Sequence, residues 1–533
     1  MTFQSQFTAQ VTTNPQGQTV PQANTGDSFA DFLLGYPVTG TMNGLPRLPY
    51  RFTQYLPYVS DTWKITRNLT LNYGVSWFLT TIPNPQKWAR NYVHSLDRST
   101  GLLTYAALGQ VSAQILSFDP KDLAPRFGLA WSPSQLRNTV IRAGAGIYYA
   151  DSALIEMQFG TVAPPYASTL AITQDQTSPS PQYELGHNVF PLLTFPPISS
   201  SFAAGLPNGT NAFLLNPASK MPYISQWNLS IQHTFSNNDL VEADYLGSSG
   251  HRLQNRYDSD QCVVTATLFC SPATKPYARY AGLLTADFNG NSSYEALIAK
   301  YEHRAAAGLN LRFEYTFAKA LTDGWESGGG SQSQIARCRA CDKGATSFDA
   351  RHRAVISTIY DLPFGRGRAF GRNMAPALDM IAGGWTVTGI TAFATGTPIF
   401  LSGPATTASL NITHRPNRIC DGNDGSLLHN LRSDGLLAFN TACFVVPPTG
   451  YFGNAGRDVI YGPGINNWDM GFQKSFPLGS EQRRLEFRAE MFNAFNHAQF
   501  GLPNANAGAA ANFGRVASAG PPRLMQMGMK LLF

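Results

Sequence analysis

The chain has few charged residues and no long apolar run. Charged side chains make up 14% of the 533 residues, well below the roughly 25% of soluble globular proteins. A run of about 18 consecutive apolar residues, which a transmembrane helix needs, does not occur in the sequence. The composition therefore argues against an ordinary soluble protein and against a helical membrane protein.

Two further features are missing. Residues 1–27 contain neither the basic segment nor the apolar segment of a secretory signal, so we expect a cytosolic chain or one whose true beginning is absent. The net charge of +6 is spread along the chain without a block of Lys and Arg. This distribution argues against nucleic acid as a partner.

The C-terminal residues 523–533 alternate with the two-residue period of a β-strand. The residues on one parity are large and apolar, and they are Met525, Met527, Met529, Leu531 and Phe533. A tilted transmembrane strand needs roughly 9–11 residues, which is the length of this segment. We therefore predict a terminal strand whose apolar parity faces the membrane.

The same period recurs along the chain and predicts about 14 strands. They are residues 1–12, 55–65, 69–79, 122–131, 139–150, 223–235, 240–253, 293–304, 309–321, 353–362, 384–397, 468–476, 485–493 and 523–533. Residues 28–35 are expected to form a short helix. Short turns alternate with long connections along this series, which is the arrangement of outer-membrane barrels.

These patterns predict an all-β chain that forms part of an antiparallel transmembrane β-barrel with long extracellular loops. We expect one domain, residues 1–533. The mean hydropathy of -0.16 agrees, because lumen-facing polar residues dilute the lipid-facing apolar ones. A soluble all-β binding module would also alternate, but its strands are usually shorter and its polar faces should carry more charge.

Six cysteines fall into three local pairs, all within long loops. The pairs are Cys262 and Cys270, Cys338 and Cys341, and Cys420 and Cys443. In an oxidising compartment they would form three local disulfides, although the sequence does not fix the connectivity. Cys338-Arg-Ala-Cys341 is also half of a redox or zinc motif, but no second CxxC or nearby His pair completes it. We expect no metal.

Charged residues recur on the polar parity of several strands. They are Arg312, Glu314, Glu486, Arg488, Glu490 and Lys530. One interpretation is a lumen wall that contacts a substrate or a plug. We favour the other, a ladder in which opposite charges on neighbouring strands contribute about 0.2–1 kcal/mol each, because the sequence shows no convergence on a ligand.

Three motifs could be mistaken for chemical sites. Residues 365–371 have the spacing GxGxxxG and precede a strand, unlike a phosphate loop. Residues 421–425 lack the spacing and terminal Glu of a calcium loop. Asp349 and His352 are close in sequence, but a catalytic triad is a spatial arrangement. We therefore expect no catalytic residues and no cofactor.

Several phrases resemble the barrel of TonB-dependent outer-membrane receptors. They include Tyr58-Val-Ser-Asp-Thr-Trp63, Ala124-Pro-Arg-Phe-Gly-Leu-Ala-Trp131, Gln226-Trp-Asn-Leu-Ser-Ile231 and Glu486-Phe-Arg-Ala-Glu-Met-Phe-Asn493. Other segments of the sequence resemble one subgroup of these receptors, the Oar-like proteins, more closely. They include Phe348-Asp-Ala-Arg-His-Arg353, Leu362-Pro-Phe-Gly-Arg-Gly367, Phe452-Gly-Asn-Ala-Gly456 and Asn466-Asn-Trp-Asp469.

The resemblance implies a location in the outer membrane of a Gram-negative-type bacterium, with outer-membrane lipid and the TonB complex as partners. It implies uptake of an unidentified extracellular nutrient; siderophore, glycan and peptide are all compatible. Family barrels have about 22 strands and a plug, so we expect an N-terminally truncated barrel without plug, signal peptide or TonB-contacting segment. The alternative is a barrel that binds or adheres to a partner without transport.

Overall fold

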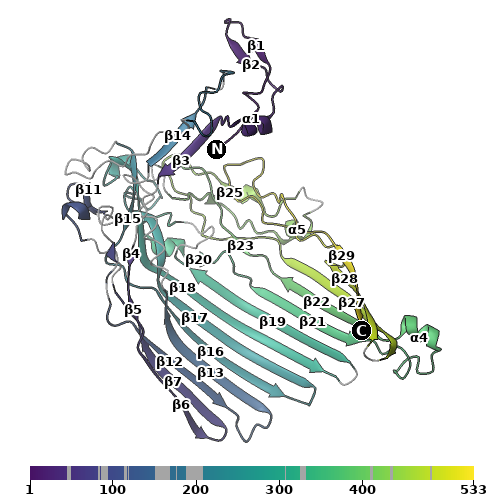
Figure 1. Ribbon diagram of the computed structural model, residues 1–533. Helices are drawn as coiled ribbons and strands as arrows, with labels where there is room; N and C mark the ends of the chain where they lie inside the picture. The colour runs from purple at the N-terminus through teal and green to yellow at the C-terminus, as the bar shows by residue number, and fades with distance from the viewer. Residues whose placement is uncertain are drawn as a thin grey trace.

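One large antiparallel sheet dominates the structure (Figure 1). The computed structural model describes residues 1–44, 50–81, 84–85, 94–112, 117, 119–150, 168–175, 177–187, 208–305, 308–324, 332–407, 412–431, 436–480 and 483–533. The sheet has 15 strands, and all but β15 and β20 follow one continuous path in chain order. The all-β antiparallel fold predicted from the alternation is confirmed.

The strands of the path pair with their neighbours in sequence. They are β6 (Tyr58–Thr66), β7 (Leu69–Trp77), β12 (Leu123–Trp131), β13 (Thr139–Tyr149), β16 (Tyr223–Thr234), β17 (Asp239–Asp258), β18 (Tyr280–Arg304), β19 (Leu309–Thr322), β21 (His352–Asp361), β22 (Trp385–Ala394), β27 (Ile465–Ser480), β28 (Arg483–Phe492) and β29 (Leu524–Leu532). Off the path, β15 (Thr210–Leu215) pairs in parallel with β18, and β20 (Gly344–Ala345) pairs with β19.

Smaller elements lie in the connections. The strands are β1 (Val11–Thr13), β2 (Thr19–Pro21), β3 (Thr39–Gly44), β4 (Tyr50–Arg51), β5 (Gln54–Tyr55), β8 (Leu79–Thr80), β9 (Asn84–Pro85), β10 (His94–Asp97), β11 (Leu102–Tyr105), β14 (Ser168–Thr173), β23 (Pro398–Ile399), β24 (Asn417–Arg418), β25 (Phe444–Val445) and β26 (Ile460–Tyr461). The helices are α1 (Ser28–Leu34), α4 (Pro376–Ala382), α5 (Gly425–His429), η2 (Ala106–Leu108), η3 (Pro272–Thr274), η4 (Arg339–Asp342) and η5 (Thr441–Cys443). No helix in the described part of the chain is both long and apolar enough to cross a membrane.

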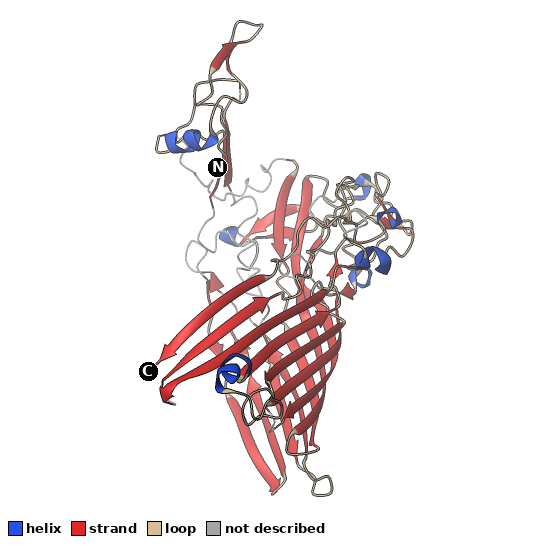
Figure 2. Cartoon of the chain, turned by 90° about the vertical axis from the view of Figure 1, so that its right-hand side faces the viewer, coloured by secondary structure: helices blue, strands red, loops and turns tan. Residues whose placement is uncertain are grey.

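The sheet curves into an incomplete barrel wall (Figure 2). Its two edge strands are β6 and β29, which do not pair with each other in the described ranges. The short connections, such as residues 67–68 and 235–238, leave the strands at one end of the wall. The long connections leave at the other end and carry the smaller strands, except residues 362–384, which leave at the short-turn end.

The cross-strand register gives the wall two different faces. One row runs through Trp63, Leu71, Leu129, Ala143, Leu229, Tyr245, Leu297 and Phe317. The neighbouring row on the opposite face runs through Thr62, Asn72, Gly128, Gly144, Asn228, Leu246, Ala296 and Ala318. Leu297 is 53% exposed, whereas its neighbour Ala296 is 3% exposed. We call these the apolar face and the polar face; in outer-membrane barrels lipid covers the apolar one.

The prediction of a strand over residues 1–12 is wrong. The strand in this region is Val11–Thr13, in the small hairpin β1–β2, and Thr2 forms a single β-bridge with Thr39. Its apolar residues serve a different purpose, because Phe3 packs edge to face on Phe32 with ring centroids 5.2 Å apart. The short helix predicted at 28–35 is confirmed as α1, which Asp27 caps by accepting hydrogen bonds from two backbone N–H groups.

Candidate functional site

The six candidate lumen charges all lie on the polar face. Glu486 stands opposite Lys530 on β29, and Arg312 stands opposite Glu302 on β18. The ion pairs of these charges form along single strands, where residues two apart share a face. They are Arg312–Glu314 at 3.4 Å, Arg484–Glu486 at 2.8 Å and Arg488–Glu490 at 3.4 Å.

A groove of about 420 Å³ connects these two groups of charges across the polar face. Arg312 and Glu302 line one side of the groove, and Glu490 lines the other. Asp469 of β27 and Ser357 of β21 lie between them. Both signs of charge are therefore present, and the described side chains show no convergence on a single ligand group.

A partly buried charge cluster on the same face was missed by the sequence analysis. Lys300 of β18 donates hydrogen bonds to Glu242 and Asp244 of β17, each at 2.7 Å. The Asp244 side chain is only 11% exposed. The alternation of β17 already places Glu242 and Asp244 on one face, so counting charges by parity in that segment would have found the cluster.

The terminal strand presents its methionines on the opposite face. Met525, Met527, Met529 and Leu531 stand beside Met491, Ala489, Phe487 and Leu485 of β28. Met527 and Met529 are 71% and 72% exposed, and Phe533 follows the end of the strand at 96%. These side chains continue the apolar face to the edge of the wall.

Three disulfides join the cysteines as local pairs. They are Cys262–Cys270, Cys338–Cys341 and Cys420–Cys443, with Cα atoms 5.5, 5.3 and 4.8 Å apart. Every pair lies in a long connection, at the end of the wall opposite the short turns. Cys262 and Cys270 pack with Ile335, Ile412 and Phe452, which come from two other loops. The disulfide-bonded loops therefore share a common apolar core.

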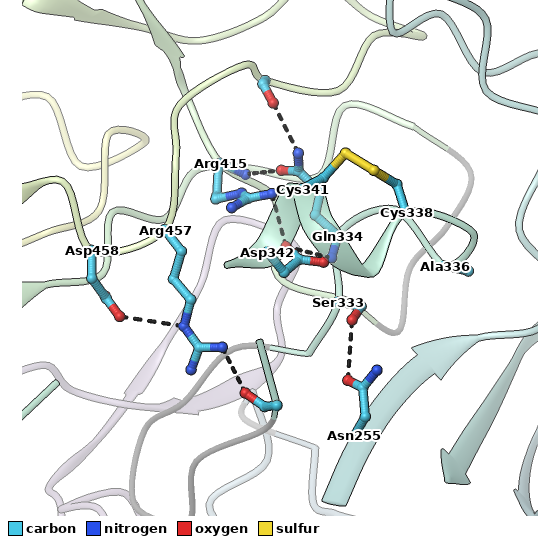
Figure 3. Close-up of polar contacts among 12 residues, drawn as sticks. Asn255, Ser333, Gln334, Ala336, Cys338, Cys341, Asp342, Arg415, Arg457 and Asp458 are labelled. Atoms are coloured by element: carbon cyan, nitrogen blue, oxygen red, sulfur yellow. Dashed lines mark hydrogen bonds and ion pairs between the residues drawn. A yellow bond between two sulfur atoms is a disulfide. The ribbon is translucent and has the colours of Figure 1, made fainter. Parts of the chain in front are cut away.

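A single buried amide, Gln334, ties these loops together (Figure 3). Its side chain accepts a hydrogen bond from Arg415 N at 2.7 Å and donates one to the Gly453 carbonyl at 2.8 Å. Its own carbonyl accepts a hydrogen bond from the Gln261 side chain at 2.8 Å. Because Gln334 is 1% exposed, it links the loops of all three disulfides from within.

Buried ion pairs surround Gln334. Arg415 Nη2 lies 2.9 Å from Asp342 Oδ1, and Asp342 comes directly after Cys341 (Figure 3). Arg457 Nε lies 3.3 Å from Asp458 Oδ2, and Arg457 also donates a hydrogen bond to the Gly324 carbonyl at 2.6 Å. Burial raises the pKa of Asp342 and lowers that of Arg415, although each charge favours the ionised form of the other.

A cavity of about 700 Å³ opens between the loops of the Cys262–Cys270 and Cys338–Cys341 disulfides and residues of β10, β15, β17 and β18. Its wall includes the disulfides of Cys262 and Cys338, and apolar side chains such as Leu214 and Ile335. Arg98 and Arg337 are exposed members of the lining, and neither guanidinium forms an ion pair with the described residues. This volume lies in the range of small-molecule sites.

The three motifs considered in the sequence have structural roles. The Asp349 carboxylate accepts a hydrogen bond from Ala320 N at 2.8 Å, whereas His352 contacts the Tyr315 hydroxyl at 2.7 Å. Asp424 caps α5. Residues 365–371 lie in the connection between β21 and β22. Within the described ranges, no group of three His, Cys, Asp or Glu side chains is arranged to hold a metal ion.

One family model matches nearly the whole chain, and several solved structures are similar to it. A family model described as an outer membrane beta barrel domain matches residues 1–526. Similar solved structures include the outer membrane transporter YddB from Escherichia coli, with a TM-score of 0.48, 10% identity, and coverage of 90% of this chain and 45% of YddB. The ferric citrate transporter FecA has a TM-score of 0.39 and 13% identity, with coverage of 97% and 47%.

The FrpB iron transporter from Neisseria meningitidis has a TM-score of 0.38 and 10% identity, with coverage of 90% of this chain and 55% of FrpB. The chain therefore spans about half the length of these solved proteins. No protein of curated function matches the chain.

Proposed function

Since the chain belongs to the family of outer membrane β-barrel domains, we propose that it forms the wall of a TonB-dependent receptor that takes up an extracellular nutrient. The observation that supports this most directly is the cavity of about 700 Å³ between the disulfide-bonded loops. The cavity lies beyond the strand ends that carry the long connections. The polar face of the wall then offers a ligand bound there a hydrophilic route along the strands.

The proposed mechanism needs no covalent chemistry. The loops capture the ligand, and the cavity offers apolar side chains together with the cations of Arg98 and Arg337. The rigid loop core around Gln334 holds the cavity walls in place before binding. By the sequence resemblance, an inner-membrane TonB partner would supply the energy for release. We treat residues 1–533 as one wall domain of such a receptor.

The test uses cells that produce the receptor in its full natural length. A radiolabelled ferric siderophore, an oligosaccharide and an oligopeptide are offered separately to cells with and without the TonB partner. We expect one of the three to accumulate only when the partner is present, and still to bind at the surface when it is absent.

The variant Arg98→Gln with Arg337→Gln should weaken surface binding of that probe, whereas Arg418→Gln in a neighbouring exposed loop should leave it unchanged. Heat-modifiable gel mobility shows whether each variant has folded. Accumulation that does not require the TonB partner contradicts energised transport. Surface binding without accumulation in any strain would instead identify an adhesion or binding barrel.

A further inference from the structure

The connection between β21 and β22, residues 362–384, differs from the other connections at its end of the wall. Other connections at this end are as short as residues 67–68 and 235–238, whereas this one contains the helix α4. In Figure 1, α4 lies beside the C-terminus, at the far end of the strands from α5 and the disulfide-bonded loops. It therefore belongs to the short-turn side of the membrane.

Two side chains of the apolar face fix α4 to the outside of the wall. Trp385 Nε1 donates a hydrogen bond to the Ile381 carbonyl at 2.8 Å. Lys474 Nζ donates to the Asp379 carbonyl at 3.3 Å and also to the Gly383 carbonyl. Trp385 and Lys474 stand side by side in the row that continues through Phe487 and Met529. The helix is thus attached on the side of the wall that faces lipid.

The connection leaves an unusually apolar surface uncovered. Its exposed side chains are Phe364, Phe370, Leu378, Met380 and Ile381, which are 46%, 59%, 53%, 65% and 72% exposed. They belong to the connection that Trp385 and Lys474 of the apolar face hold by hydrogen bonds. A bilayer covers that face, so the same lipid layer can cover these side chains without a separate partner.

Three arginines accompany this apolar surface. Arg366, Arg368 and Arg372 are exposed, and their guanidinium groups form no ion pair with the described residues. Asp379 is the sole acidic residue among positions 362–384, and it accepts a hydrogen bond from Arg366 N at 2.8 Å. A basic and apolar segment at a membrane surface favours anionic lipid headgroups, and arginine binds phosphate through several N–H groups.

We propose that residues 363–382 form an interfacial anchor that inserts its apolar side chains into the leaflet on the short-turn side and binds anionic phospholipid headgroups through its arginines. This inference is independent of any transported ligand. It rests on continuity with the lipid-facing wall and on the charge of the connection.

A lipid-quenching experiment tests the proposal. Met380→Cys introduces a single free thiol, because the six native cysteines are paired, and the thiol is labelled with a fluorophore. The protein is reconstituted in vesicles of phosphatidylcholine with a graded fraction of brominated phosphatidylglycerol. We expect stronger quenching than random contact with the bulk lipid would give at the same fraction of phosphatidylglycerol. Such an excess would show selective contact with the anionic lipid. Replacing Arg366, Arg368 and Arg372 by Gln should weaken this selectivity by about fivefold for each arginine.

The matched control replaces Arg67 and Arg137 by Gln, because these exposed arginines lie in other turns at the same end of the wall. It should retain the selectivity. Heat-modifiable mobility checks that all variants fold. Quenching that follows the bulk lipid composition would overturn the anionic preference. A label that stays in water would overturn the anchor altogether and favour a protein partner for this surface.

Discussion

The carboxylate of Asp342 and the guanidinium of Arg415 lie 2.9 Å apart, and each side chain is only 3% exposed. Asp342 comes from the loop of the Cys338–Cys341 disulfide, and Arg415 comes from the loop that contains Cys420. The pair therefore joins two loops that are far apart in sequence, at the centre of the core around Gln334.

Asp342→Asn should destabilise the packing of these loops without unfolding the strands of the wall. It removes the carboxylate that pairs with the buried guanidinium of Arg415, and breaking a buried ion pair costs about 3–5 kcal/mol. Limited proteolysis should then cut the loops between residues 332 and 464, while heat-modifiable mobility remains normal. Arg418→Gln is the control, because the Asp421 side chain of its ion pair is 72% exposed and such pairs contribute at most about 1 kcal/mol. Equal protease resistance of Asp342→Asn and wild type would contradict the role of the buried pair.

The disulfides should differ in importance according to the length of chain they close. Cys420 and Cys443 are 23 residues apart, whereas Cys338 and Cys341 are 3 apart. The chain-entropy relation gives about 3.5 kcal/mol for the first and about 2 kcal/mol for the second. Replacing Cys420 and Cys443 by Ser should thus lower the proteolytic stability of the loops more than the same change at Cys338 and Cys341. The reverse order would contradict the entropic account.

Lys300→Met should destabilise the wall itself. It leaves Glu242 and Asp244 close together on the polar face without their cation, and the loss of charged hydrogen bonds costs about 2–3 kcal/mol. The urea midpoint for unfolding in detergent should fall. Arg488→Gln is the matched control on the same face, where the arginine side chain is 59% exposed. A similar fall for both variants would mean that burial of the cluster is unimportant.

A charge on the terminal strand should reveal which face meets lipid. Met527→Lys places an ammonium on the apolar face, where a central charge costs about 2–4 kcal/mol in a bilayer. Gln526→Lys puts the same charge on the polar face, next to Glu490. We expect poor membrane assembly for Met527→Lys and normal assembly for Gln526→Lys, measured by heat-modifiable mobility in outer-membrane fractions. The opposite result would mean that lipid contacts the polar face and not the apolar face.

The ion pair between Asp119 and Lys220 should make one connection sensitive to acid. Lys220 Nζ lies 2.8 Å from Asp119 Oδ2, and its hydrogen bond holds the pKa of Asp119 below the ordinary 3.8. The folded form therefore binds fewer protons, so this stabilisation is present above pH 3.8 and is lost as the pH falls through the lower folded pKa.

The thermal midpoint of wild type should exceed that of Asp119→Asn at neutral pH. The Asp119 side chain is 7% exposed, but that of Lys220 is 45% exposed. Solvent around the ammonium group screens the pair, so the difference should be small, about 1 kcal/mol. It should shrink as the pH falls below 3.8 and disappear only below the lower pKa of Asp119 in the folded protein. A difference that grows on acidification would show that the pKa is shifted in the other direction.

Alternation along the chain predicts most of the wall, because each transmembrane strand must present lipid on one side and the lumen on the other. It underestimates β17 and β18, which were expected at 240–253 and 293–304 but extend over Asp239–Asp258 and Tyr280–Arg304. Their outer parts are covered by β15 and the loops, and Ala286 and Leu283 are fully buried there. The outer parts of β17 and β18 have no lipid-facing and water-facing sides, so apolar and polar residues do not alternate there.

The loop core could not be predicted for a different reason. Gln334, Arg415 and Gly453 belong to connections without a repeating pattern, and their contacts depend on how three loops fold over one another. The cysteine spacing does indicate local pairing. It does not indicate that the loops meet around one buried amide.

The length of β18 determines how far the protein reaches from the cell. Its 25 residues span about 80 Å at roughly 3.3 Å per residue, whereas a tilted strand needs only about 9–11 residues to cross the hydrocarbon layer. More than half of β18 therefore stands outside the lipid, paired on both sides with other strands. An arriving molecule first meets a stiff platform several nanometres above the bilayer, with its height set by the strand ladder.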